Sequence, residues 1–376
     1  MSDYQRQTYK FINLFCGILF TAFTFCYLFF YQSDLLAVMQ NIYSKGQTSY
    51  NSLVGAILIA LTLLLVHFLF SHLFKDRLDT MPALTYIPSA LLLTLMTGGC
   101  ILEDYTLSQR SSILTFVISI VCYIVVLFFI FKFNICFKYR FTKSLWCNIL
   151  LMSVIFLYVC AFSNNNRIVH VQAHVEQCLI NHNYKDALST MKKSRCSDLN
   201  LTTLKVYALS CEGLLPECLF EYNPVGTSKT LLPNGKQTLI FSQKTLYRHL
   251  GMAIIPTVSP IKQLEYSLMH GSANRHAVDY LLCGYLLDGN LNAFAKAIGK
   301  YYEINDSLPK HYKEALILYR HLYTSPSIIY KNNVMDADFI DYQKLEEDVT
   351  DYREKKNKFR DVYGNTYWYY FEYVIS

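Results

Sequence analysis

Long apolar blocks fill the first 162 residues of the chain, whereas apolar and charged residues alternate at helical spacing from residue 163 onward. A helix needs about 20 mainly apolar residues to cross roughly 30 Å of hydrocarbon. Five blocks meet this requirement and predict a transmembrane domain over residues 1–162. Its spans are expected near residues 11–31, 53–74, 83–102, 112–131 and 145–162. The third block deviates most from a regular span, because it contains Pro88 and the pair Gly98–Gly99.

Residues 163–376 predict an all-α domain built from helical hairpins. In the stretch AHVEQCLINHNYKDALSTMKKS, apolar positions recur every three or four residues on both sides of a turn at Asn181–Asn183. Similar patterns surround Gly213 and Gly289. The 31 residues from His182 to Gly213 approach the ~34-residue period of tetratricopeptide repeats. A tetratricopeptide-like array is therefore predicted, although Cys218 and Phe294 stand where that consensus prefers alanine.

The array is interrupted by an irregular insertion at residues 223–260. This segment holds four of the nine prolines of the chain, and a connection of this length is either functional or disordered. Its apolar residues, among them Leu231, Leu239 and Phe241, argue against disorder. We expect the insertion to fold back over the array, or to meet the membrane or a partner.

The chain ends in the aromatic stretch YGNTYWYYFEYVIS, which begins at Tyr363. As a helix it would close the array with one face, although its aromatic residues also suit a strand. Trp368 and Tyr369 would then point elsewhere and could contact a partner. Because tyrosine is enriched at interfaces, the candidate partner-binding residues are Tyr222, Asn223, Tyr312, Trp368 and Tyr369.

Three segments of the second domain resemble a known family: EYNPVG, LPKHYKEALILYRHL and FRDVYGNTYWYYFEY. The resemblance is to an uncharacterised family of Bacteroidota inner-membrane proteins, a domain of unknown function. Its members carry N-terminal transmembrane helices and a C-terminal tetratricopeptide-like region, and they tend to be longer and to have more spans. The resemblance implies this architecture for a shorter chain, and it implies no activity.

Positive charges in the short loops predict the orientation in the membrane. Eight Lys or Arg lie in the N-terminal segment and in the loops that follow the second and fourth spans, against three on the other side. Because cytoplasmic loops carry the excess of positive charge, the protein is expected in a bacterial inner membrane with its N-terminus inside and its second domain in the periplasm. The first apolar run, about 20 residues with no small-residue cleavage site after it, indicates an anchor rather than a signal peptide.

The charge distribution also excludes several classes of function. Of the net charge of +6, the first 161 residues contribute +4, mostly in those loops, and no stripe of cations of the kind that binds nucleic acid is present. No Asp, Glu, Lys or Arg lies well inside a span, and the lone His67 favours a helix–helix hydrogen bond over a proton relay. The spans are therefore interpreted as an anchor or an assembly surface rather than a pump.

Residues that could carry chemistry are few. The series His170, His174, Cys178 and His182 has metal-ligand residue types at four-residue steps, but a helix would spread them over about 18 Å. At most two or three could share a metal, and we expect no metal site, no catalytic residue and no cofactor. Five cysteines follow the membrane domain, and a turn between Cys211 and Cys218 could bring that pair together as a disulfide.

Two functions remain open at this point. The first is a membrane-anchored scaffold or assembly factor of the cell envelope, whose partners would be the lipid bilayer and an unidentified protein. The alternative is an envelope enzyme that acts on lipid or glycan at the membrane surface. The sequence contains no phosphate-binding loop, dinucleotide fingerprint or nucleophile elbow, which favours the scaffold.

Overall fold

The computed structural model describes residues 3–73, 82–98, 117–125, 128, 145–194, 196, 198–222, 224–232, 238–255, 258–348 and 352–375. Every regular element in these ranges is a helix, which confirms the all-α prediction. The chain forms two compact units, residues 1–173 and 174–376. The limits predicted from the sequence, 1–162 and 163–376, stay a prediction.

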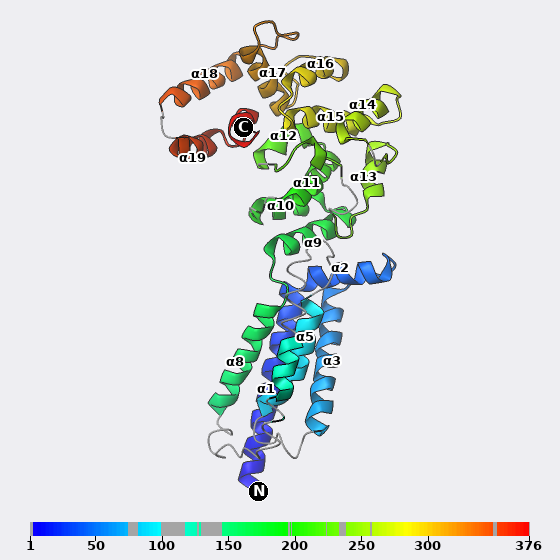
Figure 1. Cartoon of the computed structure of the whole chain (residues 1–376), viewed down its shortest axis with the longest axis vertical. Coiled ribbons are helices and arrows are strands. Elements are labelled where there is room, and N and C mark those ends of the chain that lie inside the picture. Colours follow the sequence, from blue (N-terminus) through cyan, green and yellow to red (C-terminus); the bar gives the residue numbers. More distant parts are fainter. Residues whose placement is uncertain are drawn as a thin grey trace. The chain divides into compact units, whose positions relative to one another are not determined.

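The first unit contains the apolar helices (Figure 1). Its elements are α1 (Asp3–Cys26), which continues as the π-helix η1 (Tyr27–Tyr31), then α2 (Ser33–Ser44), α3 (Ser52–Leu73), the 3-10 helix η2 (Pro82–Tyr86), α5 (Ile87–Thr97) and α8 (Leu145–Phe162). Three segments are long and apolar enough to cross a membrane: Lys10–Tyr31, Ser52–His72 and Leu145–Phe162. This part of the chain therefore has the character of a membrane protein.

Three spans, rather than the predicted five, are supported by the described residues. The block predicted at 83–102 contains an apolar helical segment, Pro82–Thr97, that is shorter than the others. Its length of about 25 Å falls short of the roughly 30 Å of a hydrocarbon core. Of the block predicted at 112–131, only residues 117–125 and 128 lie in the described ranges, and they are helical.

His67, the histidine that the sequence places inside a span, joins two elements of the first unit. Nδ1 of His67 on α3 lies 3.3 Å from the carbonyl oxygen and 3.2 Å from the hydroxyl of Thr85, and its ring stacks on Tyr86 with centroids 3.7 Å apart. The histidine is thus a contact between helices, as the sequence predicts.

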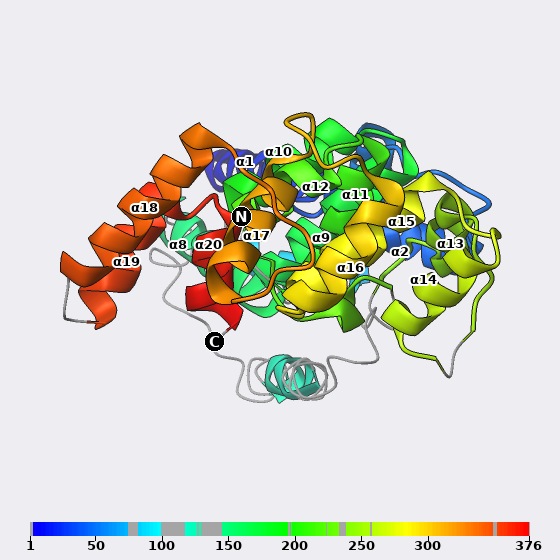
Figure 2. The ribbon, with the colours of Figure 1, turned by 90° about the horizontal axis from the view of Figure 1, so that it is seen from above.

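The second unit is a succession of shorter helices. Helix α9 (Arg167–Ile180) enters it, and α10 (Tyr184–Ser194), α11 (Leu199–Cys211), α12 (Leu215–Cys218) and η3 (Leu219–Tyr222) follow. After η4 (Ser228–Thr230) come α13 (Gln243–Leu250), α14 (Pro260–Met269), α15 (Arg275–Leu287), α16 (Leu291–Tyr301) and α17 (Lys310–Leu322). The unit ends with α18 (Asn333–Asp348), α19 (Tyr352–Tyr363), α20 (Tyr367–Tyr370) and the π-helix η5 (Phe371–Ile375). Helices α13 and α14 lie at the opposite end of this unit from α18 and α19 (Figure 2).

The helices of the second unit turn where the sequence predicts. His182, Gly213 and Gly289 all adopt positive φ, at 57°, 71° and 65°, and each is the second residue after the end of a helix. Successive helices pack against one another: α10 on α11, α14 on α15, α15 on α16 and α16 on α17. Short turns between packed neighbours make helical hairpins. That these hairpins form a tetratricopeptide-type repeat stays a prediction.

The described parts of the insertion pack onto the hairpins. Leu231 and Phe241 are buried, and α13 forms within it. The hydroxyl of Thr203 on α11 donates to the carbonyl of Thr230 at 2.5 Å, and the backbone N–H of Ser228 donates to Asp288 at 2.9 Å. Of the alternatives, the structure shows the insertion folded back over the array.

All five cysteines of the second unit are free thiols. Cys211 ends α11 and Cys218 ends α12, and the turn between them does not join them into a disulfide.

Candidate functional site

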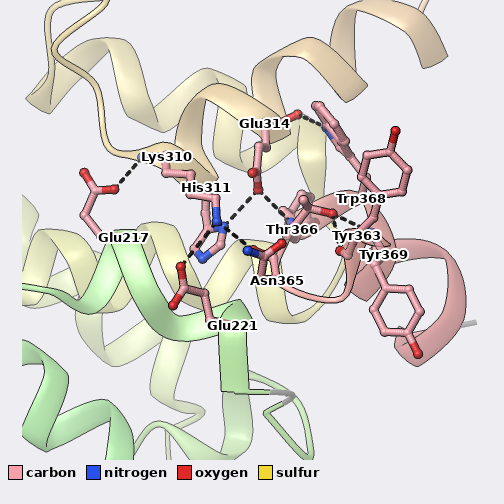
Figure 3. Close-up of polar contacts among 11 residues, drawn as sticks. Glu217, Glu221, Lys310, His311, Glu314, Tyr363, Asn365, Thr366, Trp368 and Tyr369 are labelled. Atoms are coloured by element: carbon pink, nitrogen blue, oxygen red, sulfur yellow. Dashed lines mark hydrogen bonds and ion pairs between the residues drawn. The ribbon is translucent and has the colours of Figure 1, made fainter. Parts of the chain in front are cut away.

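The aromatic C-terminal segment is held by a buried polar network on α17 (Figure 3). The carboxylate of Glu314 accepts hydrogen bonds from the backbone N–H of Tyr367 at 2.7 Å and from Nδ1 of His311 at 2.9 Å. The carbonyl of Glu314 accepts from the indole N–H of Trp368 at 2.9 Å. Both His311 and Glu314 are buried, and Nε2 of His311 has no hydrogen-bond partner in the part of the chain that the structure describes. Nδ1 of His311 therefore faces the carboxylate, and its ring links Glu314 to the start of α17.

Lys310, the first residue of α17, connects this network to neighbouring segments. The ammonium group of Lys310 lies 3.3 Å from Glu221 and donates to the carbonyl of Asn365 at 2.9 Å, while its backbone N–H donates to Glu217 at 3.0 Å (Figure 3). The hydroxyl of Thr366 then accepts from the N–H of Tyr369 and caps α20. These contacts fix where the final helix begins.

The segment packs on two sides. On one side the hydroxyls of Tyr367 and Tyr370 donate to the carbonyls of Leu286 and Leu287, which end α15. On the other side the ring of Trp368 lies 5.0 Å from that of Phe339 on α18. The ring of Tyr373 likewise lies 5.4 Å from that of Phe359 on α19. The segment is therefore an inner layer of the second unit.

The structure places three of the five predicted partner-binding residues inside the unit. Trp368 and Tyr369 are each 3% exposed, and Tyr312 is fully buried. In this structure the side chains of these three residues are not accessible to a partner at the surface. Tyr222 is the last residue of η3, and Asn223 lies outside the described residues.

Tyr312 belongs to a second polar cluster, which is partly buried. The carboxylate of Asp279 on α15 accepts hydrogen bonds from the hydroxyls of Tyr302 at 2.7 Å and Tyr312 at 3.0 Å. Burial raises the pKa of Asp279, and the two tyrosine hydrogen bonds oppose that rise. The cluster joins Asp279 of α15 to Tyr312 of α17 and to Tyr302, the residue that follows α16. Both tyrosine hydroxyls are thus used to hold helices together.

The insertion is attached through a third carboxylate, that of Glu176. Glu176 on α9 accepts from three consecutive backbone N–H groups, those of Leu239, Ile240 and Phe241, at 2.8, 2.7 and 2.8 Å. Glu176 is fully buried. A carboxylate that accepts several N–H groups stabilises the loop that supplies them. Sequence reasoning did not single out Glu176, because nothing in its neighbourhood on α9 marks the distant loop as its partner.

The series of possible metal ligands on α9 divides into two groups. His170 contacts the carbonyl of Asn164 through Nε2 at 2.8 Å, and His182 contacts the hydroxyl of Tyr184 through Nδ1 at 2.8 Å. His174 and Cys178, in contrast, meet each other and also Asp186 of α10. The spacing of the series predicted the adjacency of His174 and Cys178, and it missed Asp186.

Helix α14 presents large apolar side chains to solvent. Tyr266 is 55% exposed and Met269 is 77% exposed. The two residues are three positions apart and therefore lie on the same face of the helix. The ring of Tyr266 lies 4.0 Å from that of His270. This surface, defined by Tyr266, Met269 and His270, is called the α14 face.

The comparisons with known proteins point to a domain without an assigned role. A model described as "Family of unknown function (DUF6057)" matches residues 254–374, about a third of the chain. The matched region begins just before α14 and extends into η5. No curated protein and no solved structure matches the chain. The region from the α14 face to the aromatic segment is therefore similar to an uncharacterised family.

Proposed function

We propose that this chain is a membrane-anchored scaffold of the bacterial cell envelope, whose second unit binds a protein partner through the α14 face. The observation that carries the proposal is the contrast between α14 and three of the predicted partner-binding residues. Tyr312, Trp368 and Tyr369 are buried, whereas Tyr266 and Met269 are exposed at the surface. Tyrosine and methionine are enriched at protein interfaces, and flexible methionine adapts to a partner.

The polar network described above supports a structural role for the most conspicuous titratable side chains. Glu176, Asp279 and Glu314 all accept hydrogen bonds from groups of the same unit. They position an insertion, a helix pair and the final segment. A helical unit braced in this way offers a firm surface for an extended partner, as stacked hairpin arrays do.

We further propose that the second unit lies in the periplasm, on the opposite side of the membrane from the N-terminus. The excess of Lys and Arg in the loops on the N-terminal side supports a cytoplasmic N-terminus. Three spans and five spans both cross the membrane an odd number of times. The proposal therefore holds for either number of spans.

The test of the scaffold uses a photoreactive amino acid placed in the full-length protein in native membranes. Separate variants carry it at Tyr266 and at Met269, and a control variant carries it at Lys296, an exposed position of α16. We expect both α14 positions to capture the same protein, identified by mass spectrometry, while position 296 does not.

A second measurement follows the captured protein without crosslinking. It should co-purify with the wild-type chain and be lost when Tyr266 and Met269 are both replaced by Ser. Equal adducts from all three positions, or adducts with lipid alone, would contradict a protein-binding α14 face. Adducts with lipid or glycan together with turnover of that molecule would instead support an enzyme.

A further inference from the structure

One group of metal-ligating side chains stands apart from the braces of the fold. Cys178 Sγ lies 3.5 Å from His174 Nε2 and 3.6 Å from Asp186 Oδ2, and the last two atoms are 3.7 Å apart. All the potential ligand atoms lie within 4.8 Å of one another. His174 and Cys178 are one turn apart on α9, and Asp186 belongs to the first turn of α10. These three residues are called the His–Cys–Asp cluster.

The distances within the cluster match the edges of a zinc tetrahedron. With ordinary zinc bond lengths, tetrahedral geometry separates sulfur from nitrogen and from oxygen by roughly 3.6 Å each, and nitrogen from oxygen by roughly 3.4 Å. The circle through the three observed atoms has a radius of about 2.1 Å, so an ion about 0.7 Å above their plane lies about 2.2 Å from each, between the zinc–nitrogen and zinc–sulfur bond lengths.

The identity of the contacting atoms distinguishes a metal site from a catalytic cysteine. In a nucleophilic triad, the nucleophile and the carboxylate contact opposite nitrogens of the histidine ring. Here the thiol and the carboxylate both face Nε2. Convergence of three potential ligands on one point is the arrangement of a coordination sphere.

The turn between α9 and α10 produces this convergence. His182 adopts φ 57°, and the side chain of Asn183 accepts from the backbone N–H of Asp186 at 3.4 Å, so α10 starts back beside the end of α9. The hydroxyl of Ser189 donates to Oδ1 of Asp186 at 3.4 Å. Oδ2 is the oxygen that faces the thiol, and an outer hydrogen bond of this kind orients a metal ligand.

We propose that the His–Cys–Asp cluster binds a Zn²⁺ ion that joins α9 to α10. Thiolate, imidazole and carboxylate together suit zinc among the common divalent ions. On binding, the Cys178 thiol releases its proton to solvent as the sulfur–zinc bond forms, while a neutral His174 and an ionised Asp186 bind without proton release. The side chains of His174 and Asp186 are 35% and 50% exposed, so a water molecule takes the fourth position. Cys178 itself is buried, and the bound ion protects its sulfur from oxidation.

The test uses the full-length chain, purified in detergent with an affinity tag that contains no histidine. After treatment with a chelator and its removal, Zn²⁺ is titrated against a chromogenic zinc indicator, and Co²⁺ serves as a spectroscopic probe. We expect one Zn²⁺ per chain, and a cobalt complex with the near-ultraviolet band of a thiolate ligand. Cys178→Ser should abolish this band, and Cys178→Ser and Asp186→Asn should each weaken zinc binding at least about tenfold.

Two control variants have the same residue types at nearby positions. Cys196→Ser and His170→Ala should leave stoichiometry and affinity unchanged, because Cys196 is outside the cluster and the ring of His170 contacts the carbonyl of Asn164. Alkylation of the wild-type chain provides a measurement that does not depend on folding of a variant. Zn²⁺ should slow modification of Cys178 and leave that of Cys196 unchanged. Absence of stoichiometric zinc, or zinc that is retained by Cys178→Ser, would overturn the proposal.

Discussion

Replacement of Glu176 by Gln tests whether one buried carboxylate holds the insertion in place. Oε1 of Glu176 accepts from Leu239, and Oε2 accepts from both Ile240 and Phe241. Gln has nearly the same shape but only one acceptor oxygen. Whichever way its amide is turned, at least one backbone N–H of the loop then faces an NH₂ group instead of an acceptor.

The expected loss follows from the number of hydrogen bonds that cannot be remade. A hydrogen bond to a charged group contributes about 1.5–3 kcal/mol, so one or two lost bonds correspond to roughly 2–5 kcal/mol. Removal of a buried charge recovers part of this free energy, which brings the expected destabilisation to about 3 kcal/mol. In a unit of this size that lowers Tm by roughly 6–12 °C.

The assay combines thermal unfolding in detergent with hydrogen exchange of the full-length chain. In Glu176→Gln, the amides of residues 239–241 should exchange faster and Tm should fall. The control Asp341→Asn removes a carboxylate that is 66% exposed and paired with Lys344, and it should change stability by less than about 0.5 kcal/mol. If residues 239–241 remained as protected as in the wild type, the carboxylate would not be the attachment of the insertion.

Three further predictions concern packing, protonation and topology. Trp368→Ala should destabilise the second unit by about 3–5 kcal/mol in thermal unfolding. Trp368→Phe keeps an aromatic ring and loses the hydrogen bond to Glu314, so it should cost about 1 kcal/mol. Equal effects of the two variants would contradict this packing. Burial lowers the pKa of Lys205 from 10.5 to about 7, so the unfolded chain binds more protons between these values and stability should rise with pH across that window. Lys205→Met, which has no titratable group, should flatten this rise, and an unchanged pH slope in unfolding measurements would refute it. Alkaline phosphatase fused after Ser376 should be active and a cytoplasmic reporter at the same place inactive, whereas the reverse would place the second unit inside.

The local features of the fold could be predicted from the sequence because they depend on neighbours along the chain. Turns at His182, Gly213 and Gly289 follow from residue types that end helices, and Pro216 marks the start of α12. Apolar length predicted the helices at Lys10–Tyr31, Ser52–His72 and Leu145–Phe162. The length of the helix in the block at 83–102 could not be predicted in the same way, because hydrophobicity alone does not show that its described helix ends at Thr97.

The polar contacts could not be predicted, because their partners are far apart in sequence. Glu176 binds a loop more than sixty residues away, and Glu314 binds a segment that follows it by more than fifty. The His–Cys–Asp cluster is an intermediate case. Its two ligands on α9 follow from helical spacing, whereas Asp186 depends on the geometry of the turn at residues 181–183.

The final aromatic segment shows how a pattern can predict the right element and the wrong environment. A helix, not a strand, forms from Tyr367 to Tyr370, and Tyr367 and Tyr370 face the array as one apolar face should. The sequence pattern places Trp368 and Tyr369 outside that face and predicts that they are exposed, whereas both are buried. A helix that is apolar all round is buried all round, and here α18 and α19 supply the second covering layer through Phe339 and Phe359. The segment is thus the core between two layers rather than the end of a stack. It follows that its removal would expose both layers at once, and for this reason the proposed partner surface is the α14 face, where Tyr266 and Met269 are exposed.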